Sequence, residues 1–100
     1  MTGWTKGSIL ITNQIGLHAR PSVKLTKLAK SFPCAVEVAA RGDGPWISGK
    51  SIVKVMAMRL KKGTILFLRA KGDGADAAIA ALTGLVARNF DEDEAHAANG

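Results

Sequence analysis

His18 and Arg20 are the residues whose types and spacing point to chemistry. They lie in the block 16–21 (GLHARP), between a glycine turn and the start of a basic helical segment. A neutral imidazole nitrogen can attack phosphorus and form a phosphoramidate that is labile enough to pass its phosphoryl group onward. A guanidinium can hold phosphate oxygens through two parallel hydrogen bonds. The pair therefore suggests a reversible carrier, with His18 as phosphoryl acceptor and donor and Arg20 as the group that stabilises the phosphate.

The expected position of His18, at the N-terminal edge of a helix, favours this chemistry. Backbone N–H groups and the dipole at that end favour an anion and disfavour a protonated imidazole, so the ring should be neutral and nucleophilic. The loop has neither Mg²⁺-binding carboxylates nor a nucleotide-binding glycine loop nearby, so His18 would depend on a phosphorylated donor protein. The alternative for a lone histidine is an ordinary helix cap or a half-buried polar residue. His96 lies in the acidic tail without an ordered neighbour, and we expect it to have no chemical role.

Hydrophobic patterning predicts the elements that position His18. Residues 8–12 (SILIT) are β-branched and apolar and predict a strand that ends before the glycine turn. A helix should follow, with Pro21 in its first turn and Pro33 after its end. Its predicted buried stripe is Leu25, Leu28, Ala29 and Phe32, and its predicted exposed basic face is Arg20, Lys24, Lys27 and Ser31.

The middle of the chain predicts a strand, a turn, a second strand and a short helix. Residues 35–40 alternate between apolar and polar side chains, and residues 42–45 (GDGP) read as a turn before a short strand at 46–48. Ser51 is expected to cap a short helix, because a serine oxygen can accept a hydrogen bond from a backbone N–H. That helix would carry the apolar residues Ile52, Val53, Val55 and Met56.

The last part of the chain predicts a central strand and a long helix. Residues 64–69 (TILFLR) are almost continuously apolar, which is typical of a strand with neighbours on both sides. Asp73 and Asp76 favour a helix N-terminus. The apolar stripe of that helix is predicted to consist of Ala75, Ile79, Leu82, Val86 and Phe90.

This order, β-α-β-β-α-β-α, predicts the fold class. With short turns between strands and helices between pairs, we expect an α+β open-faced β-sandwich, a four-stranded antiparallel sheet with three helices on one face. We expect a single domain over residues 1–90 and a flexible acidic tail over residues 91–100, which has no large apolar side chain.

The charge is unevenly distributed along the chain. Residues 1–71 contain 13 Lys and Arg against 2 Asp and Glu, or +11, and residues 72–100 contain 1 against 6, or −5. A basic body attracts acidic partner surfaces, either proteins or nucleic acids, although simple solubility is an equal alternative on composition alone. The sequence shows no recognition helix and no ribonucleoprotein aromatic pair, so we expect no nucleic-acid partner.

Composition also limits the location of the protein and its bound groups. The lone cysteine, Cys34, cannot form an internal disulfide or a zinc site and is expected to be a small core residue. No apolar run is long enough for a membrane helix and no secretory signal is recognisable, so we expect a cytoplasmic protein without membrane insertion. We also expect a monomer with no cofactor and no metal.

Residues 16–21, after a strand and before a helix, resemble the active loop of the phosphocarrier protein HPr family. Residues 49–52 (GKSI) resemble the family's regulatory serine at the start of its second helix. Residues 62–64 (KGT), followed by an apolar strand and Gly72, are similar to its later half. The resemblance covers about residues 7–90. Ser22 stands where the family usually has alanine, and Ala57 and Arg59 stand where serine and glycine are frequent.

The resemblance implies a relay role. His18 would take a phosphoryl group at Nδ1 from phosphorylated enzyme I of the phosphoenolpyruvate-dependent phosphotransferase system and pass it to a histidine of an enzyme IIA. The chain would be a phosphohistidine carrier and not an enzyme. Partners would bind an apolar surface beside the histidine, for which we expect Val55 to point inward and Ile52 and Val53 to be partly exposed. The predicted partner-binding residues are Leu17, Ile52, Val53 and Met56, with Arg20, Lys24, Lys27 and Lys54 around them.

Ser51 resembles the serine modified by HPr kinase/phosphorylase, and a phosphate there would oppose acidic partners at the same surface. A plain N-cap is the alternative, and the two roles are compatible. Residues 90–93 (FDED) resemble nitrogen-branch members more than sugar-branch members. A second hypothesis is therefore a regulatory binding module of a nitrogen-type branch that is not coupled to sugar uptake.

Overall fold

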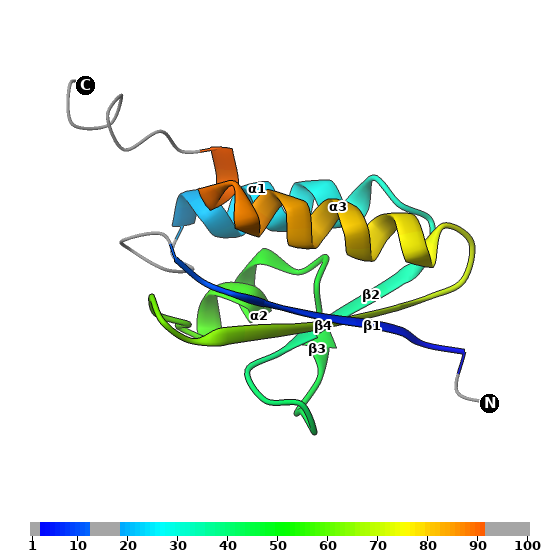
Figure 1. Cartoon of the computed structure of the whole chain (residues 1–100). Coiled ribbons are helices and arrows are strands. Elements are labelled where there is room, and N and C mark those ends of the chain that lie inside the picture. The colour runs from blue at the N-terminus through cyan, green and yellow to red at the C-terminus, as the bar shows by residue number, and fades with distance from the viewer. Residues whose placement is uncertain (1–2, 13–18, 92–100) are drawn as a thin grey trace.

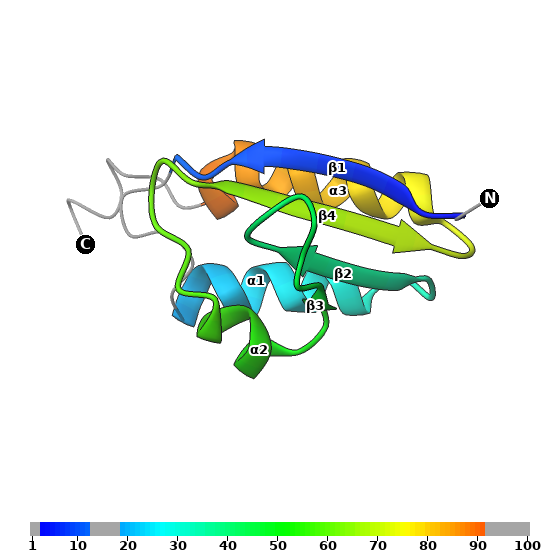
Figure 2. The ribbon, with the colours of Figure 1, turned by 90° about the horizontal axis from the view of Figure 1, so that it is seen from below.

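The computed structural model describes residues 3–12 and 19–91. Its elements are β1 (Thr5–Leu10), α1 (Ala19–Lys30), β2 (Ala35–Ala39), β3 (Ile47–Ser48), α2 (Ile52–Ala57), β4 (Ile65–Lys71), α3 (Ala75–Ala87) and the 3₁₀ turn η1 (Asn89–Asp91). The strands form one antiparallel sheet in the order β1-β4-β2-β3. α1 and α3 lie across one face of the sheet, and α2 packs at its β3 side next to α1 (Figure 1, Figure 2). The predicted α+β open-faced β-sandwich is confirmed.

β4 has a central position, as predicted, because it pairs with both β1 and β2. Strand alternation sends Leu66, Leu68 and Ala70 to the helical face, where all three are fully buried. β1 starts at Thr5, earlier than the predicted start at residue 8, because pairing with β4 extends it beyond its apolar run. A Cβ at Gly7 would lie 2.7 Å from Ile79 Cγ2, so the glycine lets α3 approach β1 closely.

The core lies between the sheet and the helices and follows the predicted stripes. α1 contributes Leu25 and Ala29, and α3 contributes Leu82 and Val86. Cys34 is buried, as predicted. Of the predicted α1 stripe, Leu28 and Phe32 are partly buried and pack against this core. None of the helices in the described ranges has the length and apolarity needed to cross a bilayer.

The end of the last helix differs from the prediction. α3 stops at Ala87, and Phe90 lies in η1, where Asn89, Phe90 and Asp91 have φ angles of 54°, 58° and 58°. Phe90 is still fully buried. The apolar spacing therefore correctly predicts burial of this ring but not its route, because a left-handed turn and a continued helix can both return one side chain to the core.

The open face of the sheet holds a cation–aromatic cluster. The Arg69 guanidinium carbon lies 4.2 Å from the ring centroid of Trp4 and 4.4 Å from that of Trp46. Arg69 also donates from Nε to Glu37 Oε1 at 2.8 Å. A guanidinium over an indole face is attracted by the ring quadrupole. This cluster holds the segment before β3, and thus the approach to α2, against the sheet.

Candidate functional site

The start of α1 is the part of the predicted phosphoryl site that the structure describes. α1 begins at Ala19, so Leu17 and His18 precede it in the sequence and lie outside the described residues. Arg20 is exposed in the first turn, and Pro21 is buried in the same turn, as predicted. That turn contains no acidic residue. The N–H groups and the dipole of α1 therefore favour an anion at this end, with an exposed guanidinium beside it.

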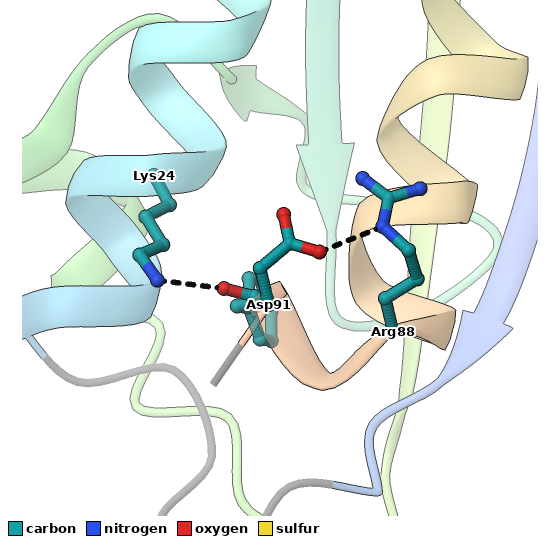
Figure 3. Close-up of polar contacts among 4 residues, drawn as sticks. Lys24, Arg88 and Asp91 are labelled. Atoms are coloured by element: carbon teal, nitrogen blue, oxygen red, sulfur yellow. Dashed lines mark hydrogen bonds and ion pairs between the residues drawn. The ribbon is translucent and has the colours of Figure 1, made fainter. Parts of the chain in front are cut away.

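The basic face of α1 turns partly toward α3. Lys27 is exposed, whereas Lys24 is half-buried and donates from Nζ to the carbonyl oxygen of Phe90 at 2.8 Å (Figure 3). The sequence contains no local signal for this bond, because its partners are 66 positions apart. Both lysines line a groove of about 500 Å³ between α1 and α3, together with Leu28, Ser31, Leu85, Arg88 and Asp91.

α2 presents the expected apolar side chains. Val55 is fully buried, whereas Val53 is 75% exposed and Met56 38% exposed. Ile52 is half-buried. The predicted division of α2 into an inward and an exposed side is confirmed.

The predicted basic residues around this patch do not line one groove. Lys54 is exposed and lines a groove of about 530 Å³ with Glu37, Trp46 and Met58. α1 contacts α3 on one side and α2 on the other (Figure 2). Lys24 and Lys27 therefore lie on the α3 side of α1, whereas Lys54 belongs to α2, on the other side of α1.

Ser51 caps α2, as predicted. Its φ and ψ are −105° and 110°, and its Oγ accepts a hydrogen bond from the N–H of Lys54 at 3.4 Å. The side chain is half-buried. Lys50 donates from Nζ to the carbonyl oxygen of Phe32 at 2.8 Å, which ties the start of α2 to the segment after α1.

Two unusual residues have structural consequences. Arg59, beyond α2, has a φ of 51°, a conformation that glycine adopts more easily. Ser22 in α1 is fully buried, and its hydroxyl has no hydrogen-bond partner within the described part of the chain. Nothing in the structure explains why alanine stands at position 57, where the family frequently has serine.

Comparisons with known proteins agree with this architecture. The family model described as PTS HPr component phosphorylation site matches residues 5–88. The chain is 42% identical over 86 residues to the phosphocarrier protein HPr of Pseudomonas aeruginosa, a match that covers 86% of this chain and 94% of that protein. It is 42% identical over 77 residues to the phosphocarrier protein HPr of Mycoplasma capricolum, covering 77% of this chain and 84% of that protein.

Solved structures give the same result. HPr-C-His from Thermoanaerobacter tengcongensis superposes with a TM-score of 0.81 at 32% identity, covering 89% of this chain and 98% of that one. A histidine-containing phosphocarrier protein from Mycoplasma superposes with a TM-score of 0.75 at 37% identity, covering 86% of this chain and 94% of that one. The chain therefore belongs to the HPr family of the phosphotransferase system, and it is a phosphocarrier protein and not an enzyme.

Proposed function

We propose that His18 carries the phosphoryl group, which it accepts from phosphorylated enzyme I and passes to a histidine of an enzyme IIA. The observation that carries this proposal is the start of α1 at Ala19, directly after His18 in the sequence of an HPr-family chain. Arg20 is exposed one residue later. In this proposal the protein acts as a cytoplasmic monomer.

The transfer is a substitution at phosphorus. The lone pair of His18 Nδ1 forms the new P–N bond while the bond between phosphorus and the donor breaks, and that electron pair stays on the donor. Arg20 and the N-terminal N–H groups of α1 hold the phosphoryl oxygens and spread their negative charge. The return reaction with enzyme IIA uses the same contacts in reverse order.

The partner surface combines apolar side chains with nearby cations. Its apolar centre is formed by Ile52, Val53 and Met56, of which Val53 is the most exposed, together with Leu17. Arg20, Lys24 and Lys27 supply charge from α1, and Lys54 supplies charge from α2. An apolar centre with a charged rim is the usual anatomy of a protein interface, and the positive rim fits acidic partners.

Phosphorylation by enzyme I tests the proposal directly. The chain is incubated with purified enzyme I and phosphoenolpyruvate, and the modified atom is located by NMR and mass spectrometry. The wild type and H96Q are expected to gain one acid-labile phosphate, whereas H18Q gains none. If the wild type gains no phosphate from an enzyme I that is active on another carrier, the proposal is wrong. Subsequent transfer to sugar-type and nitrogen-type enzyme IIA proteins identifies the branch.

Ser51 is the proposed regulatory site for an HPr kinase/phosphorylase. Its half-buried hydroxyl lies at the cap of α2, next in the chain to Ile52 and Val53. A phosphate there places a dianion beside a surface that binds acidic partners, so binding weakens while the fold is retained. S51D is expected to raise the KM for enzyme I, whereas S8D, at an exposed position on β1, leaves it unchanged. Equal effects of both variants would exclude a specific role for Ser51.

A further inference from the structure

The chain leaves the helical layer beside the basic face of α1. Arg88 donates from Nε to Asp91 Oδ1 at 2.8 Å, and Lys24 donates to the carbonyl oxygen of Phe90 at 2.8 Å. Figure 3 shows Lys24 of α1 and Arg88, the C-cap residue of α3, on either side of Asp91. Asp91 is also the first residue of the acidic run 91–94 (DEDE). An acidic segment therefore begins between two cations, one in α1 and one directly after α3.

This exit point is held firmly by the fold. The left-handed φ angles of Asn89, Phe90 and Asp91 reverse the chain after α3, and the fully buried Phe90 ring anchors the turn in the core. Thr12 donates from Oγ1 to Asn89 Oδ1 at 2.7 Å, which links the turn to the segment after β1. The reversal directs Asp91 toward α1.

The groove beside Asp91 has a charge that suits an acidic segment. Its described lining residues include three cations, Lys24, Lys27 and Arg88, and one carboxylate, that of Asp91. The whole of α1 contains Arg20, Lys24, Lys27 and Lys30 and no acidic residue. The hydrogen bond from Arg88 lowers the pKa of the Asp91 carboxyl, and the charges of Arg88 and Lys24 lower it further.

The length of the acidic run also fits the basic face. Arg20, Lys24 and Lys27 follow one another at about one helical turn, or roughly 5–6 Å. Three extended residues span about 10 Å. Because Asp91 lies beside Lys24, three residues that follow Asp91 can reach either Arg20 or Lys27.

We infer that residues 92–94 bind the basic face of α1 and the α1–α3 groove, where they compete with acidic partner proteins. The occupant of this surface is thus the protein's own tail, and a partner must displace it. The competition rests on the proposed function, because it assumes that partners use the cations of α1. The binding of the tail to α1 does not depend on the proposed function.

Spin labelling tests whether the tail binds. A nitroxide is attached to the cysteine of A97C, and the buried Cys34 is not modified. Broadening of the amide NMR signals is then compared between the labelled protein with its natural tail and the labelled protein that also carries E92Q/D93N/E94Q. Broadening at Lys24 and Lys27 should fall at least about twofold in the neutralised tail and in roughly 0.5 M salt, because exposed charges are screened there. Signals of Lys6 and Phe67, on the sheet, serve as the internal reference. Equal broadening of α1 in both tails would overturn the inference.

Partner binding tests the competition. At low salt, E92Q/D93N should bind enzyme I about two- to fivefold more tightly than the wild type, as expected for a few exposed charge pairs. D43N/D73N makes the same change in net charge at exposed positions outside the tail. Its gain in affinity for enzyme I is expected to be less than half of the gain in E92Q/D93N. If both pairs improve binding equally, or neither does, competition by the tail is overturned. If no variant binds enzyme I or accepts phosphate, the proposed function fails, and the broadening still decides whether the tail binds.

Discussion

Ser22 is the single residue whose burial is least well compensated. It is fully buried in α1, and its Oγ has no hydrogen-bond partner among the described residues. A buried hydroxyl that has lost its water without gaining a partner costs about 1–3 kcal/mol. Alanine removes this oxygen and is also the better helix former.

S22A is therefore expected to raise the free energy of unfolding by about 1 kcal/mol. Urea denaturation followed by circular dichroism measures the change. S8A, at an exposed serine on β1, is the control and should change stability by less than about 0.5 kcal/mol. A destabilised S22A would mean that the hydroxyl has a partner in the folded protein.

Arg59 carries backbone strain at an exposed position. Its φ of 51° lies in the left-handed region, which costs a residue with a Cβ roughly 1–2 kcal/mol. R59G removes this strain, but the greater freedom of glycine in the unfolded chain offsets part of the gain, so we expect a net stabilisation of about 0.5–1 kcal/mol. R41G, at an exposed arginine without a positive φ, should be neutral or destabilising. The midpoints of thermal unfolding distinguish the two, and equal shifts would contradict the strain.

Among the elements, the turn after α3 links the packing of the core to the charge at the surface. Phe90 points into the core, while the next side chain, Asp91, pairs with Arg88. The side chain of Arg88 is 57% exposed and that of Asp91 is 56% exposed. Because this pair is open to solvent and salt, it contributes little to global stability and mainly orients the exit of the chain.

The pair should nevertheless be visible in the pH dependence of stability. Arg88 lowers the pKa of the Asp91 carboxyl in the folded state, with a further contribution from Lys24. The stabilisation is thus present above the unfolded-state pKa, about 3.9, and is lost as the pH falls through the folded-state value. D91N should reduce the loss of stability between about pH 5 and pH 2. If D43N reduces it equally, the Arg88–Asp91 pair is not the cause.

For the molecule as a whole, the open sheet and the helical layer divide the surface by function. α2 packs against α1 and lies beside the start of that helix (Figure 2), whereas the Arg69 cluster occupies the opposite face of the sheet. The proposed partner surface therefore combines two helices that are separated in the chain by β2 and β3.

V53A tests this surface without disturbing the core, because Val53 is 75% exposed. It should raise the KM for enzyme I about fivefold, as expected for the loss of about 1 kcal/mol at an interface residue, and leave the unfolding midpoint unchanged. I65A removes an apolar side chain that is 45% exposed on β4 and should leave the KM unchanged. An unchanged KM in V53A would mean that Val53 does not contribute to the binding of enzyme I.

Much of this fold is predictable from local patterning. Leu25 and Ala29 in α1, Leu82 and Val86 in α3, and the continuous apolar strand β4 follow from periodicity, because burial of one face imposes a repeat on nearby residues. The N-cap at Ser51 is equally local, since its hydrogen bond joins Oγ to an N–H three residues later. The roles of His18 and Arg20 remain predictions from motif and family.

Other features depend on partners that are distant in the sequence. The bond from Lys24 to Phe90, the placement of Arg69 between Trp4 and Trp46, and the division of the basic residues between two grooves each join separate elements. No repeat in the chain signals such contacts, because they depend on how helices and strands pack after they form. Local residue order was thus sufficient for the elements and the candidate motif, whereas folding into three dimensions set which cations face which surface.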